Sequence, residues 1–213
     1  MMLFVESTAA HWDAVYGSKA PVEQSWFEAD PAASLRLIEE WASPTSGVVD
    51  VGAGASTLVD RLLVDGFEDV TLVDVSRRVL EAVRERLGPA ARAVKFVASD
   101  VLSWEPGRRF GVWHDRAVFH FLTDGADRDR YVAQASDAVS EEGVVVLATF
   151  ADDGPEMCSG LPVCRYTPQQ LREVFVAFDM MHAERVEHVT PWGVKQPFTY
   201  VVMRHRSMRT TSP

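Results

Sequence analysis

The chain has 213 residues, 47% of them hydrophobic and 24% charged, which suits a single α/β domain with a sizeable core. Its 21 Lys and Arg residues against 31 Asp and Glu residues give a net charge of −10 at pH 7. Binding to a phosphate backbone needs a dense positive surface, so this composition argues against a nucleic-acid substrate.

The sequence shows no sign of a targeting or membrane segment. No apolar run approaches the roughly 18 residues that span a bilayer, and the first residues, MMLFVEST, lack the basic start of a signal peptide. Cys158 and Cys164, the two cysteines, do not make a disulfide framework. We therefore expect a protein of the reducing cytoplasm with no membrane association.

Apolar strands alternate with amphipathic helices through most of the chain. In chain order, the predicted elements are a helix at Ala32–Trp41, a strand at Gly47–Val51, a helix at Ser56–Val64, a strand at Val70–Val73, a helix at Ser76–Leu87, strands at Ala93–Ala98 and Phe110–Trp113, a helix at Asp127–Val139, a turn at 141–143, a strand at Val144–Phe150, a helix from Thr167 or Pro168 to about Phe178, and extended segments near Ala183–Val189 and Phe198–Arg204. Apolar strands separated by helices indicate a parallel sheet covered on both faces. The last two segments have no helix between them, which predicts an antiparallel hairpin at the sheet edge. Residues 205–213 are predicted to form a polar tail.

The stretch VVDVGAGAST at 48–57 places two glycines after a buried strand and before a helix. In an open α/β sheet, ligands bind beyond the carboxyl ends of the strands. Gly52 and Gly54 let the backbone turn sharply and let a ligand approach, because glycine has no Cβ. Asp50 just before them would repel a pyrophosphate but suits a ligand with an ammonium group. A tight strand-to-helix turn is the alternative for the glycine pair alone.

Acidic residues also end the next two strands. Asp74 lies 20 residues after Gly54, where a carboxylate can accept both hydroxyls of an adenosine ribose. Asp100 is placed to accept a hydrogen bond from an exocyclic amine, such as that of adenine. The alternatives are that Asp74 simply precedes a helix capped by Ser76, and that Asp100 is a turn or cap residue. Together, in this order and spacing, the residues predict a nucleoside ligand.

The succession VVDVGAGAS, VTLVDVS and FVASDV resembles the class I S-adenosylmethionine-dependent methyltransferases, over about Trp12 to Arg204. The resemblance implies a single Rossmann-like domain over residues 1–213. Its sheet would be doubly wound, seven-stranded and mostly parallel, with an antiparallel last strand and helices on both faces. S-adenosyl-L-methionine would be the cofactor and S-adenosyl-L-homocysteine the product.

The resemblance also implies which residues bind the cofactor. In that family the first motif packs against the methionine part, the second strand end holds the ribose, and the third lies beside adenine. The matching residues are Asp50, Gly52, Ala53, Gly54, Asp74, Val75, Ser99, Asp100 and Val101. The region His114-Asp115-Arg116, at the end of the fourth strand, would border the sulfonium and the acceptor.

The N-terminal stretch HWDAVYGSKAPVEQSWF resembles the start of several small methyltransferases of this fold, including protein-lysine methyltransferases. There it folds over the cofactor as a lid, so the resemblance implies a lid at residues 1–30 with Tyr16, Ser25 and Trp26 facing the cofactor. Ordinary packing of an N-terminal arm is the alternative. The chain departs from the lysine methyltransferases in having Asp115-Arg116 where they carry an acidic residue followed by lysine.

The acceptor candidates follow the fourth and fifth strands. Methyl transfer mainly needs alignment of nucleophile, methyl and sulfur in a dry site, with a base only where the acceptor must lose a proton. Asp115 and His120 are the candidate catalytic residues. The candidate substrate-binding residues are Arg116, His120, Cys158, Arg165 and Tyr166. Residues 151–166 leave the fifth strand as a long loop and are predicted to cover the substrate.

Several of these residues also have a purely structural interpretation. His120 could instead be a packed, hydrogen-bonded histidine of the core. Cys158 could serve only for packing, and Arg165 could form a surface salt bridge. We expect no metal site, because the two cysteines have too few further ligands nearby.

We therefore expect methyl transfer to a small-molecule acceptor, through an oxygen, nitrogen or sulfur nucleophile, by direct in-line displacement. A protein lysine is the alternative acceptor, and we expect a monomer or a homodimer. The competing functions are an NAD(P)-dependent oxidoreductase and a non-catalytic nucleoside-binding protein. Thr57 in place of a third glycine, together with Asp100, argues against the oxidoreductase.

Overall fold

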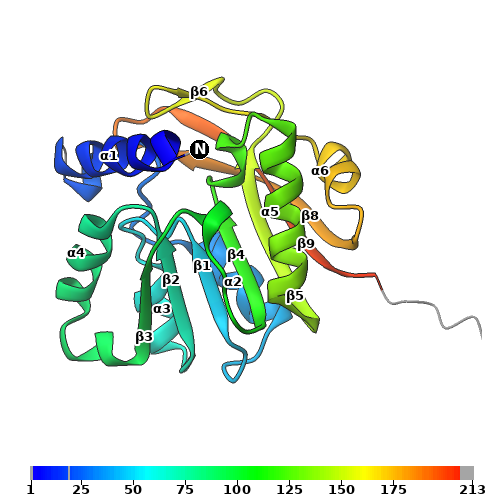
Figure 1. Cartoon of the computed structure of the whole chain (residues 1–213), viewed down its shortest axis with the longest axis horizontal. Helices are drawn as coiled ribbons and strands as arrows, with labels where there is room; N and C mark the ends of the chain where they lie inside the picture. The colour runs from blue at the N-terminus through cyan, green and yellow to red at the C-terminus, as the bar shows by residue number, and fades with distance from the viewer. Residues whose placement is uncertain (1, 19, 207–213) are drawn as a thin grey trace, which may run out of the picture.

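A computed structural model describes residues 2–18 and 20–206 of the chain, with side chains from Thr8 onward. Its centre is a seven-stranded sheet in the order β3-β2-β1-β4-β5-β9-β8 (Figure 1). The strands are β1 Val48–Val51, β2 Val70–Asp74, β3 Val94–Ala98, β4 Phe110–Arg116, β5 Val139–Phe150, β8 Phe178–Val189 and β9 Lys195–His205. The first five of these pair in parallel, and β9 lies antiparallel between β5 and β8. This arrangement confirms the predicted fold class.

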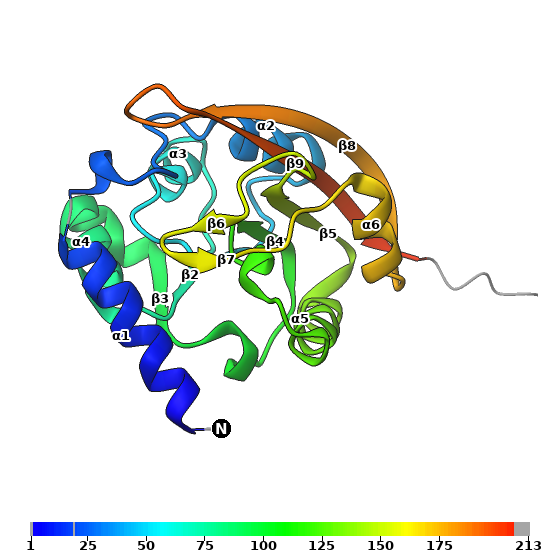
Figure 2. The same cartoon turned by 90° about the horizontal axis from the view of Figure 1, so that it is seen from above.

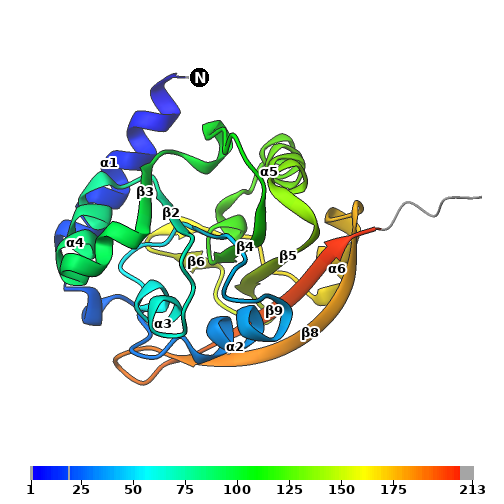
Figure 3. The same ribbon diagram turned by 90° about the horizontal axis from the view of Figure 1, so that it is seen from below.

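Helices cover both faces of the sheet. Side chains of α2, α3 and α4 pack into one hydrophobic cluster, and those of α5 and α6 pack into another on the opposite face. Figures 2 and 3 show α2 and α3 on the side of the sheet away from α5. The helices are α1 Met2–Ser18, α2 Ala32–Trp41, α3 Leu58–Val64, α4 Arg77–Leu87, α5 Gly125–Ala138 and α6 Pro168–Val174, with short 3-10 turns η1 Pro21–Glu23, η2 Gly88–Ala93, η3 Val101–Ser103 and η4 Phe119–Phe121. None of the helices in the described part of the chain is long and apolar enough to span a membrane.

The alternation of side chains along each strand decides which face a polar residue meets. In β1, Val48 belongs to the cluster under α2 and α3, whereas Val49 and Val51 belong to the cluster under α5. Asp50 therefore points to the α2 side. In β4 the same rule sends His114 to the α2 side and Asp115 to the α5 side.

Two segments lie over the carboxyl ends of the strands. Helix α1 packs beside α4, and the hairpin of β6 Met157–Cys158 and β7 Leu161–Pro162 crosses above the sheet (Figures 1 and 2). These are the segments predicted as a lid at 1–30 and a covering loop at 151–166; residues 1 and 19 lie outside the described part. Each therefore sits at the edge where the strand-end carboxylates gather.

Most predicted elements are confirmed within one to three residues, but three predictions are wrong. Residues 141–143 are not a turn, because β5 continues through them as one strand from Val139. The helix beginning at Pro168 ends at Val174, and Phe178 instead begins β8, paired with His205. Since His205 ends β9 and the Arg206 N–H bonds the Ala177 carbonyl, the tail begins later than 205; residues 207–213 lie outside the described part.

Candidate active site

The carboxyl ends of β1, β2 and β3 meet at the acidic residues singled out by sequence. The Asp74 carboxylate accepts the Gly54 N–H at 2.9 Å and the Ser76 N–H at 2.8 Å. The Ser99 N–H donates to the Asp74 carbonyl at 2.9 Å, which brings the end of β3 alongside. An ionised carboxylate offers about four acceptor positions, so two remain for ligand hydroxyls after these bonds.

Burial makes Asp74 a weak acid. Its side chain is nearly inaccessible, and burial raises the pKa of Asp74 to about 6, although the bonds from Ser76 and Gly54 oppose that shift and the nearby Asp50 and Asp13 add to it. At neutral pH the group is therefore a carboxylate, the form that accepts hydrogen bonds.

The glycine loop is shaped for close approach. Gly52 has φ +63° and Gly54 has φ +52°, the left-handed region that side chains disfavour. A Cβ on Gly52 would lie 1.9 Å from Val118 Cγ2, and one on Gly54 would lie 2.7 Å from the Tyr16 hydroxyl. The space above the loop is thus filled by two side chains, one from α1 and one from the segment after β4.

The N-terminal arm lies over the site through an aromatic cluster. The ring of Trp12 contacts those of Tyr16, Trp26 and Phe121, with centroids 5.3–6.0 Å apart. The Ser76 hydroxyl donates to the Asp13 carboxylate, which ties α1 to the start of α4. Tyr16 and Trp26 therefore lie near the glycine loop.

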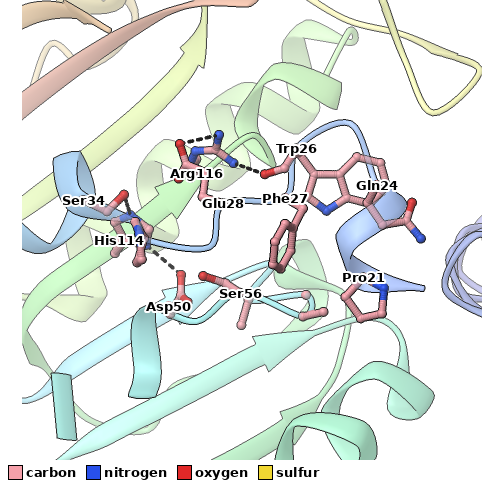
Figure 4. Close-up of a pocket in the computed structure, with 15 residues that line it drawn as sticks. Pro21, Gln24, Trp26, Phe27, Glu28, Ser34, Asp50, Ser56, His114 and Arg116 are labelled. Carbon is pink, nitrogen blue, oxygen red and sulfur yellow. Dashed lines mark hydrogen bonds and ion pairs between the residues drawn. The ribbon is translucent and has the colours of Figure 1, made fainter. Parts of the chain in front are cut away.

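Below this arm is a cavity of about 50 Å³ (Figure 4). Its lining includes Trp26, Glu28, Ser34, Asp50, Gly52, Ala53, Gly54, His114 and Arg116. Pockets for small ligands usually hold at least roughly 300 Å³, so binding a nucleoside here requires the Tyr16 and Val118 side chains to move aside. The carboxylates and glycines beneath these side chains fit a nucleoside that carries an ammonium group.

The remaining adenine-side candidates have structural partners as well. The Asp100 carboxylate accepts the Leu102 N–H at 2.8 Å and caps η3. Val101 is buried, whereas Val75 and Ser99 are half-buried beside it. Asp100 thus caps η3, and this hydrogen bond involves one of its two carboxylate oxygens.

Asp115 is fully buried and held by protein groups. Its carboxylate accepts the Val118 N–H at 2.8 Å, the Phe119 N–H at 3.0 Å and the Tyr131 hydroxyl. Burial raises the pKa of Asp115 to about 6 despite these bonds. The side chain points toward α5 and away from the cavity, so this geometry favours shaping of the loop after β4 over contact with the cofactor or the acceptor.

The Arg116 side chain is also bound by other groups of the protein. Its guanidinium donates to the Tyr200 hydroxyl at 3.1 Å and the Trp26 carbonyl at 2.9 Å, and pairs with Glu28 at 3.1 Å. His188 also contacts Glu28 at 3.4 Å. Arg116 therefore anchors the segment carrying Trp26 and Glu28 over the sheet, which leaves it little capacity for an acceptor.

His120, in η4 after β4, has no hydrogen-bond partner for either ring nitrogen among the described residues. It is fully buried between the rings of Phe121 and Phe150, at centroid distances of 4.5 and 4.9 Å. Burial, helped by the charge of Arg116, lowers the pKa of His120 to about 3. The imidazole is therefore neutral, with one donor and one acceptor to offer.

The other acceptor candidates divide between the two faces. Cys158 is buried in the cluster that also contacts Tyr16 and Trp26, and burial raises the pKa of its thiol to about 11. Tyr166 packs against Phe119 in the opposite cluster. Arg165 bonds the Gly154 carbonyl and Glu156 within its own loop. The structure brings Cys158 to the site but not Arg165 or Tyr166.

Three residues at the site were missed by the sequence analysis: Ser34, Glu28 and Val118. His114 was expected only as part of the stretch that borders the sulfonium and the acceptor. Its pairing with Asp50 was not predicted, although a polar residue in the middle of an apolar strand needs a partner. No local pattern indicated Ser34, since its role depends on how α2 packs on β1 and β4.

Comparison with known proteins agrees with this geometry. Residues 48–143 match the family described as "Methyltransferase domain". The chain carries a methyltransferase domain. The matched residues run from β1 into β5 and include the glycine loop and Asp74, which confirms the predicted resemblance.

Individual relatives are distant. The mouse (Mus musculus) "eEF1A lysine and N-terminal methyltransferase" is 25% identical over 122 residues, which is 55% of this chain but 17% of that protein. A crystal structure of the glycopeptide N-methyltransferase MtfA with S-adenosyl-L-methionine has a TM-score of 0.64 at 20% identity, covering 84% of this chain and 95% of that one. The 1,6-didemethyltoxoflavin-N1-methyltransferase of Burkholderia thailandensis has a TM-score of 0.69 at 19% identity, covering 94% and 85%. At these identities the two structures establish a shared fold.

The glycine loop gives a first prediction. Gly52→Ala should lower the free energy of unfolding by more than the roughly 1–2 kcal/mol of a left-handed alanine, because its Cβ also meets Val118. Gly107→Ala is the matched control, with φ +66° and no atom within 4 Å of an added Cβ. In a Val118→Ala background the cost of Gly52→Ala should approach that of the control. Equal costs of Gly52→Ala and Gly107→Ala in urea unfolding would contradict this close contact.

The pKa of Asp74 gives a second prediction. Since its folded pKa is raised above the ordinary value, the folded state binds an extra proton between about pH 4 and pH 6, and stability falls as pH rises through that range. The stability of the wild type relative to Asp74→Asn should therefore decrease between these values and then level off. The comparison cancels the titration of Asp115. A difference in unfolding free energy that is constant or rises with pH would show that Asp74 is not a buried, weakly acidic carboxyl.

Proposed function

We propose that this protein transfers a methyl group from S-adenosyl-L-methionine to a small-molecule acceptor and releases S-adenosyl-L-homocysteine. The observation that carries the proposal is the Asp74 carboxylate, fixed by the Gly54 and Ser76 N–H groups directly beside a glycine loop. The methyltransferase domain match over residues 48–143 supports the reaction class.

The residues at the strand ends provide the cofactor contacts. Asp74 accepts the ribose hydroxyls, Asp50 faces the ammonium group, and Asp100 lies on the adenine side. When bound, the cofactor supplies a methyl group already activated by its sulfonium. The protein's own work is then to hold the reactants in line and to exclude water.

The N-terminal arm provides the exclusion of water. Tyr16 and Trp26 cover the glycine loop through the cluster around Trp12, and Arg116 secures the arm through the Trp26 carbonyl. Moving Tyr16 off Gly54 admits the cofactor, and the arm then closes over it. We propose the same covering role for residues 151–166 on the acceptor side.

A compact, neutral acceptor fits this site best. The walls at the acceptor end are aromatic, from Trp12, Phe121 and Phe150, and the cation of Arg116 is already paired. Both ring nitrogens of His120 lack a partner among the described residues, and we propose that His120 hydrogen-bonds the attacking atom's N–H or O–H group. MtfA and the toxoflavin enzyme are named for nonprotein or glycopeptide acceptors, whereas the mouse relative is named for lysine, so a protein lysine is the second candidate.

The cellular setting is part of the same proposal. An acidic chain with two free cysteines suits the reducing cytoplasm, and the protein acts as a monomer or a homodimer. Neither nucleic acid nor membrane is expected as a partner.

Binding measurements test the cofactor. Calorimetry should show binding of S-adenosyl-L-homocysteine and no heat with NAD(P). Asp74→Ala should weaken that binding by roughly 1–3 kcal/mol, because hydroxyls lose a charged acceptor. Asp69→Ala, at the other end of β2, should leave the affinity unchanged. Unchanged affinity in Asp74→Ala would remove the assigned ribose site, and binding of the nicotinamide cofactor alone would favour an oxidoreductase.

Turnover tests the acceptor contact. A screen for S-adenosyl-L-homocysteine release over phenols, amines, thiols, carboxylates and cell extract separates an enzyme from a non-catalytic nucleoside-binding protein. With an acceptor found this way, His120→Phe should lower kcat/KM by about tenfold or more through loss of a hydrogen bond to the acceptor, with cofactor affinity unchanged. His182→Phe, on β8, is the control. A kcat/KM unaffected by His120→Phe would make His120 a packing residue.

A further inference from the structure

A buried histidine holds the carboxylate that faces the cofactor's amino end. His114 Nδ1 lies 2.7 Å from Asp50 Oδ1, and His114 Nε2 lies 2.9 Å from the Ser34 hydroxyl. All three side chains are buried, with exposed fractions of 3%, 3% and 1% for Asp50, His114 and Ser34. They come from β1, β4 and α2, and Figure 4 shows them converging on one wall of the cavity.

The chemistry of the groups sets the direction of these bonds. An ionised carboxylate only accepts hydrogen bonds, so His114 carries its proton on Nδ1 and donates to Asp50. In the tautomer that carries its single proton on Nδ1, Nε2 is an acceptor and the Ser34 hydroxyl donates to it. One tautomer of His114 satisfies both neighbours.

Tyr200, beside Ser34, joins this wall to the arm over the site. Its hydroxyl accepts from Arg116 Nε at 3.1 Å, and Arg116 also donates to the Trp26 carbonyl. From Ser34 through His114 to Asp50, each donor points the same way. Such aligned bonds polarise one another and hold their members in one geometry. Asp50 is thereby fixed from behind by a continuous network.

No lysine or arginine of the described residues pairs with Asp50. The guanidinium of Arg116, the cation of this network, is already paired with Glu28. A buried carboxylate is costly unless it meets a cation or several donors. Asp50 lines the cavity beside Gly52 and Gly54, so the ammonium group of a ligand would meet it from that side.

We propose that His114 is a positioning residue that, backed by Ser34 and Tyr200, fixes Asp50 to receive the ammonium group of the cofactor's amino-acid half. This inference rests on the proposed function, and it makes the network the device that selects an adenosyl amino acid over a nucleoside thioether without the amino acid. His114 touches neither the methyl group nor the acceptor and acts through Asp50.

Two ligands separate this role from general support of the fold. S-adenosyl-L-homocysteine and 5′-methylthioadenosine share adenine, ribose and thioether sulfur, and the latter lacks the amino acid. By calorimetry, His114→Phe should weaken S-adenosyl-L-homocysteine by about tenfold or more, the range for losing a hydrogen bond to a charged group. The affinity for 5′-methylthioadenosine should stay unchanged. A buried residue outside the network, Thr149→Val on β5, should change neither affinity.

Further variants show whether His114 works through Asp50. His114→Asn retains a donor near the Nδ1 position and should recover most of the affinity. In an Asp50→Asn background, His114→Phe should have almost no additional effect, because the charge that it positions is gone. Ser34→Ala should weaken S-adenosyl-L-homocysteine in the same selective way but less.

The following outcomes would contradict the inference or the proposed function. Equal losses for both ligands, or additive effects of the Asp50 and His114 substitutions, would make His114 a purely structural residue. If thermal melting shows that His114→Phe does not fold, Ser34→Ala and His114→Asn decide by the same two-ligand comparison, and a loss shared by both ligands overturns the inference. The inference is also overturned if the wild-type protein binds 5′-methylthioadenosine as tightly as S-adenosyl-L-homocysteine. Wild-type protein that binds neither ligand refutes the proposed function itself.

Discussion

The register of the parallel strands is the constraint on which the site depends. Asp50 of β1 lies directly opposite His114 of β4, and Val51 lies opposite Val73, one residue before Asp74. Side chains alternate between faces along a strand, so a slip of one residue would turn each of these groups to the wrong side. In the observed register, the glycine loop leaves β1 at a point where the Gly54 N–H can donate to the Asp74 carboxylate. The crevice and the positions of its carboxylates follow from this alignment.

Local spacing made part of this arrangement predictable. The glycine loop, Asp74 and the Ser76 cap lie within short stretches whose geometry depends on nearby residues. The helix and strand periods likewise identified a doubly wound sheet with a closing hairpin. The end of α6 was predicted too late because the apolar residues at 175 and 178 suit a helix as well as a turn into β8, where Phe178 pairs with His205.

Contacts between distant segments were beyond such reasoning. Asp115 and Arg116 are neighbours in sequence, and both were predicted at the sulfonium. Alternation in β4 instead sends Asp115 to Tyr131 under α5 and Arg116 to the Trp26 carbonyl on the other side. The pairing of His114 with Asp50 joins residues 64 positions apart. Only the strand order, which places β4 beside β1, reveals it.

The proposed function requires the cofactor to displace Tyr16 and to sit on the strand-end carboxylates. A crystal structure of the protein with S-adenosyl-L-homocysteine tests it most directly. We expect the ribose hydroxyls on Asp74, the ammonium group beside Asp50, and the Tyr16 hydroxyl moved away from Gly54. A ligand bound elsewhere, or Tyr16 and Val118 still filling the glycine crevice at saturating ligand, would contradict it.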